Sequence, residues 1–409
     1  MSAALQRAAW QSIPLIIVCG CLIAMLGFGP RSTLGFFLTP MSTANGWGRD
    51  VFALAIAIQM LVWGAAQPFV GAIADRFGPV LVLCAGALLY TIGFAWMTFA
   101  ASPTEMYLSG GVMVGFGLAG VSFTVVIGAF GKLLPPQWRS FSFGVGTAAS
   151  SFGQFLFSPL AVALNSAFDW HTTLLIFAGV VLLIMPLSLA LAAPKSLETP
   201  AQRAAQQSVG AALREALGHP SFVFLVLGYF SCGFQVFFVT VHLPAYLVDR
   251  GLSADLGAFV IATIGLFNIV GSITAGYLSN VMPKRYILAI IYFLRAVAVA
   301  IFIAVPATTS TSIVFGAVMG LLWLSTIPPT NALVAVMFGT RWLTMLAGFA
   351  FFSHQVGGFL GVWLGGLLFE RTGSYDAIWW LFILLGLLSA VINLPIKEQP
   401  VARPEAAAA

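Results

Sequence analysis

The sequence predicts an all-α polytopic membrane protein with twelve transmembrane helices in two six-helix halves. First, 60% of its 409 residues are hydrophobic and only 7% are charged, whereas about a quarter of the residues in a water-soluble domain carry charge. Second, the apolar residues gather in runs long enough to cross a bilayer as helices. Third, one long polar interval, at 194–220, divides these runs into six and six.

The predicted spans follow from these runs, and the polar interval sets the domain organisation. We expect an N-terminal half at 1–193, a cytoplasmic linker at 194–220 and a C-terminal half with a short cytoplasmic tail at 221–409. A short surface helix is expected in the linker near 209–217, and no acidic residue is expected inside a span. No small-residue cleavage site follows the first run, so we expect it to be retained as a span. The runs lie near 13–38, 51–72, 79–100, 107–131, 141–164, 172–193, 221–247, 256–278, 286–305, 311–338, 344–369 and 376–395.

The distribution of basic residues predicts the orientation. With a cytoplasmic N-terminus, most of the 17 lysines and arginines lie in inner segments, as the positive-inside rule requires. We therefore expect an integral protein of a bacterial cytoplasmic (inner) membrane with both termini inside. Two arginines, Arg31 and Arg295, lie within spans.

The two halves also resemble each other in sequence. A parallel six-helix repeat implies a site near the membrane midplane between the halves, with access alternating by rocking. Shifts of 203 to 205 residues pair Asp50 with Asp255, Gly71 with Gly276, Asp75 with Asn280, Gly117 with Gly320, Ser122 with Ser325 and Gly153 with Gly357.

The stretch from Gly71 to Gly78, Gly-Ala-Ile-Ala-Asp-Arg-Phe-Gly, resembles the loop signature of the major facilitator superfamily. A degenerate second copy follows at Gly276 to Asn280. The resemblance implies the twelve-helix major facilitator fold and a gating role for Asp75 and Arg76 in a cytoplasmic latch.

Three further stretches resemble the monocarboxylate transporter and oxalate:formate antiporter branch of this superfamily. They are Gly46 to Arg49, Leu134 to Arg139, and Pro328 to Asn331 with the following Met337 to Gly339. The antiporters use an arginine in the eighth span and a lysine in the eleventh to hold a dicarboxylate. Those positions match Ser272 and His354 here, so a clamp of two cations is not expected.

Arg31 is the leading candidate for substrate binding. A charge inside a span carries an insertion cost of about 2.5–3.5 kcal/mol and normally faces a cavity or a partner. Gly27, Gly29 and Pro30 precede it and weaken the helix, and irregular backbone at membrane depth is tolerated where it is buried in protein or lines water. An anion site is our interpretation. The alternative is that Arg31 lies near the outer helix end and extends its side chain to the membrane surface.

Other polar residues within the spans complete the candidate site. His354 can donate to a carboxylate and titrate near neutral pH, so it is a candidate for substrate binding and proton coupling; the alternative is a packing histidine. We expect a structural role for Arg295, while His242 is either an outer gate or an interfacial residue. Neutral candidates for ligand binding, which can equally bond neighbouring helices, are Gln59, Gln154, Gln235, Gln355, Asn268 and Asn331.

These features favour a secondary active transporter of a small carboxylate or related organic anion, either proton-coupled or exchanging. The alternatives are an exporter of hydrophobic or amphiphilic compounds and, in another class, a non-transporting membrane receptor.

The sequence has no nucleophile–base pair, metal-ligand spacing or phosphate-binding loop, so we expect neither an enzyme nor a cofactor or metal. The basic residues are scattered singly, which excludes nucleic acid as a partner. The partners expected are the anion, possible protons and the lipid bilayer, with the chain functional as a monomer.

Overall fold

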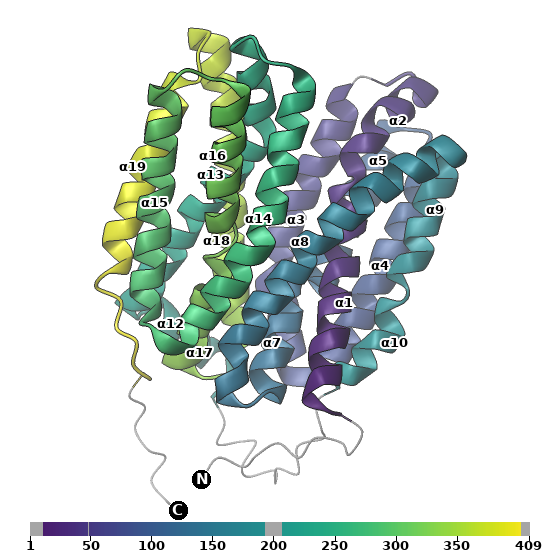
Figure 1. Cartoon of the computed structure of the whole chain (residues 1–409). Helices are drawn as coiled ribbons and strands as arrows, with labels where there is room; N and C mark the ends of the chain where they lie inside the picture. The colour runs from purple at the N-terminus through teal and green to yellow at the C-terminus, as the bar shows by residue number, and fades with distance from the viewer. Residues whose placement is uncertain (1–10, 48, 193–206, 402–409) are drawn as a thin grey trace, which may run out of the picture.

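In a computed structural model, which describes residues 11–47, 49–192 and 207–401, the chain forms a bundle of long helices (Figure 1). Twelve of the helical segments are long and apolar enough to cross a membrane. This number confirms the prediction from the apolar runs. The predicted linker helix is also present, as α12 (Val209–Leu217); the part of the linker at 194–206 lies outside the described residues.

Among the first six spans, the first, fourth and sixth are built from several helical pieces, and the second, third and fifth are single helices. In order, the six spans are α1 (Ile13–Ser32) with η1 (Leu34–Phe37) and α2 (Leu38–Asn45); α3 (Arg49–Phe77); α4 (Pro79–Phe99); α5 (Pro103–Met106), η2 (Tyr107–Met113), α6 (Val114–Val121) and α7 (Phe123–Leu133); α8 (Pro136–Ala167); and α9 (Trp170–Val181), α10 (Ile184–Ser188) and η3 (Leu189–Leu191).

The last six spans are more continuous. They are α13 (Pro220–Asp249), α14 (Ala254–Val281), α15 (Lys284–Ala304), α16 (Thr309–Leu322) with α17 (Ile327–Phe338), α18 (Leu343–Thr372) and α19 (Asp376–Asn393). In Figure 1, α12 lies at the end of the bundle where α1 begins and α19 ends. We call this end the linker end.

Local sequence signals explain where the helices begin. Proline occupies the first turn of several of them, including Pro79 in α4 and Pro220 in α13, where its missing N–H costs nothing. Ser12 and Ser253 accept backbone N–H bonds at the starts of α1 and α14, as N-cap residues do. Gly78 turns the chain from α3 into α4 with φ of 93°, a conformation that suits glycine.

The expectation that no acidic residue lies inside a span was wrong: Glu105, Asp249, Asp255 and Asp376 lie in end turns of the helical spans, and Asp75 lies in the last turn of the second. The apolar run ends at residue 72, but α3 continues to Phe77 and includes Asp75 in the second span. The helix extends this far because Asp75 is buried against residues of the other half, and not because the sequence there is apolar.

The fourth and tenth spans are each interrupted, and the repeat pair Ser122 and Ser325 lies at the two interruptions. Ser122 is extended, with ψ of 152°, between α6 and α7. Ser325 lies in the segment 323–326 between α16 and α17. The internal repeat therefore includes the positions at which the fourth and tenth spans are interrupted.

Close contacts at small residues join the two halves. A Cβ atom on Gly144 of α8 would lie 2.6 Å from the Ser272 carbonyl oxygen of α14. In the equivalent contact, a Cβ atom on Gly348 of α18 would lie 2.9 Å from the Gln67 carbonyl oxygen of α3. The helices approach this closely because glycine has no side chain. The pairs α3 with α18 and α8 with α14 therefore form the interface between the halves.

Candidate functional site

Arg31 on α1 is partly buried and makes few bonds. Its Nε donates to Gln59 Oε1 of α3 at 3.3 Å, and Gln59 Nε2 donates to the Gly110 carbonyl oxygen at 2.8 Å. The guanidinium carbon lies 6.0 Å from the centroid of the Phe28 ring and 5.8 Å from that of Trp63. In the described part of the chain, neither terminal nitrogen has a hydrogen-bond acceptor and no carboxylate pairs with Arg31. The Arg31 guanidinium is thus hydrogen-bonded through Nε, and its two terminal nitrogens have no acceptor among the described residues.

The position of Arg31 along its span bears on the two interpretations of this residue. The chain stays helical beyond it, through η1 and α2 to Asn45. Its partner Gln59 is fully buried and lies about 15 Å along α3 from the start of that helix at Arg49, at 1.5 Å per residue. These contacts favour a guanidinium within the bundle over one that extends to the membrane surface.

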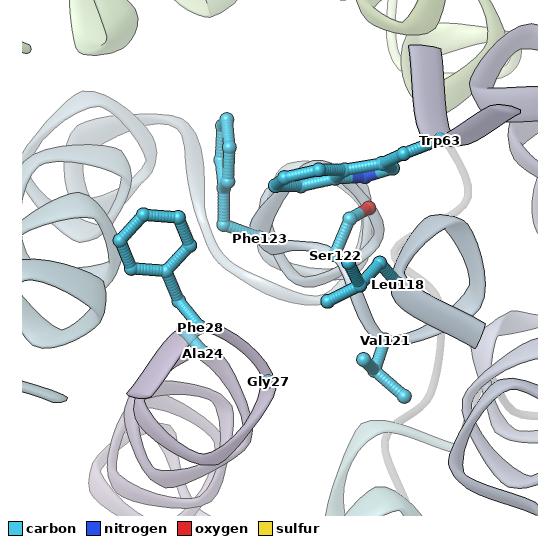
Figure 2. A pocket seen from close by; sticks show the side chains of 8 residues that line it. All are labelled: Ala24, Gly27, Phe28, Trp63, Leu118, Val121, Ser122 and Phe123. Atoms are coloured by element: carbon cyan, nitrogen blue, oxygen red, sulfur yellow. The ribbon is translucent and has the colours of Figure 1, made fainter. Parts of the chain in front are cut away.

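A small pocket lies beside Arg31 (Figure 2). It is lined by α1, α3, α6 and α7 and by the interruption at Ser122, and it shares the Phe28 and Trp63 rings with the guanidinium. Figure 2 shows the Ser122 hydroxyl directed towards the Trp63 indole, with Phe28 and Phe123 across the opening. The pocket is lined by three aromatic rings, by aliphatic residues and by one hydroxyl.

Aromatic rings connect Arg31 with His354 in the other half. Trp63 of α3 packs on Phe351 of α18 with ring centroids 5.0 Å apart, and Phe351 stacks on His354 at 5.8 Å and 11°. Arg31 and His354 therefore lie on opposite sides of the same aromatic contact between the halves. The two rings that connect them, Trp63 and Phe351, were not singled out by the sequence analysis.

His354 is buried, with 5% of its surface exposed, among Tyr229, Phe237 and Phe351. Its Nδ1 is 3.4 Å from Gln355 Oε1, and its Nε2 has no hydrogen-bond partner among the described residues. Gln355 Nε2 donates to the Met60 carbonyl oxygen of α3 at 3.3 Å. Gln355 therefore takes part in the contact between the halves.

Arg295 is fully buried and bonded on all sides. Its Nε and Nη2 donate to the Leu322 carbonyl oxygen at 3.1 and 2.7 Å, and Nη2 also donates to the Trp323 carbonyl oxygen. Its Nη1 donates to Gln235 Oε1 at 3.1 Å, and Gln235 Nε2 donates to the Phe382 carbonyl oxygen. A cation at the C-terminus of α16 satisfies free carbonyls and opposes the helix dipole. These contacts support a structural role for Arg295 and place Gln235 with it, away from Arg31.

The other neutral candidates are dispersed. Asn268 donates to Ser151 Oγ of α8 at 2.6 Å and accepts from the Leu324 N–H at 2.9 Å, so it joins the halves and supports the interruption of the tenth span. Asn331 donates to the Ile327 carbonyl oxygen of its own helix at 2.8 Å. Gln154 on α8 is partly buried. The structure brings none of the three to the Arg31 pocket.

The latch expected near Asp75 has a different composition from the one predicted. The Asp75 side chain is fully buried; Oδ1 accepts from Lys132 Nζ at 2.7 Å, and Oδ2 accepts from the Met345 N–H of α18 at 2.8 Å. Asp75 thus caps the first turn of a helix in the other half. Arg76 is exposed, with its guanidinium over the Phe77 ring, and is not part of this contact. Lys132 was not among the predicted site residues, because its only signal in the sequence is its place after the fourth span.

His242 lies far from this latch, on the half of α13 remote from the linker end. Its Nε2 is 2.9 Å from the Val362 carbonyl oxygen and its Nδ1 is 3.3 Å from the Tyr375 hydroxyl. Both partners belong to the C-terminal half, so the structure gives His242 contacts within one half and none that would gate between halves among the residues described. No group of three or more described histidines, cysteines or acidic residues is arranged to hold a metal ion.

The comparisons with known proteins agree with this architecture. The family model described as Major Facilitator Superfamily matches residues 20–362. The chain belongs to this superfamily. As a member it is an integral membrane transporter for a small organic substrate, and it is not an enzyme.

Relatives of this superfamily member include bacterial and animal proteins. The uncharacterized MFS-type transporter YcxA of Bacillus subtilis is 27% identical over 378 residues, which cover 89% of this chain and 90% of YcxA. Monocarboxylate transporter 13 of Rattus norvegicus is 27% identical over 368 residues, which cover 89% of this chain and 84% of the rat protein. Among solved structures, the fucose:proton symporter FucP of E. coli matches with a TM-score of 0.70 at 16% identity, covering 93% of this chain and 98% of FucP. This last likeness concerns the fold.

Proposed function

We propose that this transporter is a secondary active carrier of a small carboxylate or related organic anion, with Arg31 as the group that holds the negative charge. The observation that carries the proposal is the open guanidinium: Arg31 is partly buried in the N-terminal half, it is bonded only through Nε, and no described carboxylate neutralises it. The planar fork of an arginine can hold both oxygens of a carboxylate. The names of relatives such as monocarboxylate transporter 13 point to the same substrate class.

We propose that Gln59 positions Arg31 and that His354 carries a proton when transport is proton-coupled. Gln59 is buried and bonded on both sides of its amide, to Arg31 and to the Gly110 carbonyl oxygen, which supports a fixed direction for the guanidinium. The Nε2 atom of His354 has no hydrogen-bond partner among the described residues, which supports this role. A contact route through Trp63 and Phe351 gives a physical path by which the two groups can influence each other.

We further propose that the linker end faces the cytoplasm of a bacterial cell, with both termini on that side, and that one chain is the working unit. The excess of basic residues in the segments at this end supports this orientation. In that orientation the structure is closed to the cytoplasm, because the Asp75 bond to Met345 and the contact of Gly144 with α14 lie at the linker end.

The test is anion binding by purified protein. Formate, acetate, propionate, pyruvate and benzoate are titrated by calorimetry, each beside a neutral amide such as acetamide, and uptake is measured in proteoliposomes. Arg31→Gln should weaken binding of the acids by about 10- to 100-fold, the equivalent of about 1.5–3 kcal/mol for a bond between charged groups. The affinity of Arg31→Lys for the acids should lie between that of the parent and that of Arg31→Gln.

Arg371→Gln is the matched control, since it removes the same charge from an exposed position on α18. It should leave affinity unchanged. If Arg31→Gln binds the acids as tightly as the parent, or if the parent binds only the neutral amides, the anion proposal is wrong.

A further inference from the structure

The two interrupted spans differ in how their polar groups are satisfied. At the interruption of the tenth span, the serine hydroxyl, one backbone N–H and two carbonyls have partners within the protein. Arg295 bonds the Leu322 and Trp323 carbonyls, the Leu324 N–H donates to Asn268 Oδ1 at 2.9 Å, and Ser325 Oγ donates to the Leu321 carbonyl oxygen at 2.6 Å. The protein itself therefore supplies the acceptor for the serine hydroxyl of this break.

The equivalent break in the fourth span has unused donors. The Ser122 side chain is 4% exposed, and its Oγ has no partner among the described residues. The N–H groups of Val125 and Val126 turn back to the Ser122 carbonyl oxygen at 3.0 and 3.4 Å, which leaves those of Phe123 and Thr124, at the start of α7, without an intrahelical acceptor. No side chain caps this helix. Buried donors of this kind normally find an acceptor.

The Ser122 hydroxyl opens into the pocket beside Arg31 (Figure 2). The pocket offers about 10 Å³ to the centre of a water-sized sphere, which is close to the room that one oxygen atom needs. Two of its walls, Phe28 and Trp63, are the rings on which the guanidinium lies. The Val121 carbonyl is covered by Gly27 of α1, where a Cβ atom would lie 2.7 Å from its oxygen.

We propose that the break at Ser122 is an acceptor subsite: the Ser122 hydroxyl and the free N–H groups at the start of α7 receive one oxygen of the carboxylate whose charge Arg31 holds. The inference rests on the proposed function for the identity of the ligand. An oxyanion gains there from hydrogen bonds and from the positive end of the α7 dipole, the combination that makes helix N-termini bind anions. The ligand thereby closes the N-terminal break as Arg295 and Asn268 close the C-terminal one.

The first experiment needs no knowledge of the substrate. Ser122→Asp places a tethered carboxylate at the subsite, where the α7 N–H groups and Arg31 can bind it. Its melting temperature should equal or exceed that of the parent. The matched variant is Ser325→Asp, at the equivalent break, where the Leu324 N–H and the Ser325 hydroxyl already have acceptors; it should melt well below the parent. If Ser122→Asp melts as far below the parent as Ser325→Asp, the break has no free donors and the subsite is refuted.

The second experiment measures affinity for the five carboxylates named above. Ser122→Ala should weaken binding about five- to tenfold, the effect of one lost hydrogen bond, whereas Ser122→Thr retains the hydroxyl and should bind within twofold of the parent. Ser325→Ala should bind as the parent does. Unchanged affinity in Ser122→Ala would mean that water fills the pocket, and it would refute the subsite even where Arg31→Gln abolishes binding. Failure of the parent to bind any acid would instead refute the proposed function. The melting temperatures of Ser122→Asp and Ser325→Asp would still show whether the break at Ser122 has free hydrogen-bond donors.

Discussion

Replacing Asp75 with asparagine should open the linker end. In the structure the buried Asp75 carboxylate accepts from Lys132 Nζ at 2.7 Å and from the Met345 N–H of the other half at 2.8 Å. The second bond crosses between the halves, as does a hydrogen bond from the Thr344 side chain of α18, so the loss or weakening of these bonds favours separation directly. A hydrogen bond to a charged group contributes about 1.5–3 kcal/mol. Asp75→Asn retains a neutral acceptor, so the equilibrium should shift towards the open state by at most about 10- to 100-fold.

Cysteine labelling can measure this shift. In a variant without the four native cysteines, Ser140→Cys places a thiol at the interface of α8 with α14, where Ser140 is 7% exposed and its carbonyl oxygen contacts Gly276. This reporter touches neither Asp75 nor its partners. A membrane-impermeant maleimide, added from the linker side, should label it faster in Asp75→Asn by up to the factor of the equilibrium shift.

Asn280 supplies the matched control, because it occupies the equivalent position in the second half. Its amide donates to the Gln137 carbonyl oxygen at 3.5 Å, a long neutral bond that contributes little. Asn280→Ala should therefore change labelling less than threefold. If Asp75→Asn labels at the parent rate while Lys132→Met labels faster, the bond to Met345 does not hold the linker end closed and the reasoning fails.

Three other predictions follow from the same contacts. Arg295→Gln should lower the melting temperature because the Leu322 and Trp323 carbonyls lose their donors, but the ratio of affinities among the five carboxylates should stay as in the parent; a changed ratio would give Arg295 a direct role. His354→Gln keeps a hydrogen-bond donor but cannot carry a proton, so proton-coupled uptake should lose its dependence on pH, and an unchanged pH profile in proteoliposomes would assign the histidine to packing. Reporters that are active only in the cytoplasm should be active when fused in the linker or after Val401, and reporters active only outside should be inactive there. Activity of an outside reporter at either position would contradict the proposed orientation.

The fold was predictable because it depends on properties that are local in sequence. Apolar runs of sufficient length determined the twelve spans, and the polar interval between them contained the helix at Val209–Leu217. The repeat pair Ser122 and Ser325 even marked where two spans break, although its meaning was visible only in the backbone. A helix end such as Phe77 was missed because burial of Asp75 against the other half, rather than hydropathy, extends α3.

The roles of individual polar residues were less predictable because their partners are distant in sequence. The amide of Gln235 was a reasonable ligand candidate, yet it lies against Arg295, 60 residues away. Lys132 joins Asp75 across 57 residues, and nothing near either residue indicates the pairing. Trp63 and Phe351 had no signal at all, because a chain with 36 phenylalanines and 11 tryptophans offers too many aromatic residues in its spans to single out two.

The two intramembrane arginines differ in how completely the protein satisfies their guanidinium groups. The shift of 204 that pairs Gly153 with Gly357 also pairs Arg31 with Gln235, so each half has a polar side chain at the same place on its first helix. In the C-terminal half this side chain is neutral and bonds a buried guanidinium that the Leu322 and Trp323 carbonyls also satisfy. In the N-terminal half the charge itself occupies the place and has one bond, to Gln59. A guanidinium taken out of water needs compensation for its lost hydration. In the N-terminal half this compensation is incomplete at Arg31, and a bound anion can supply the missing hydrogen-bond acceptors.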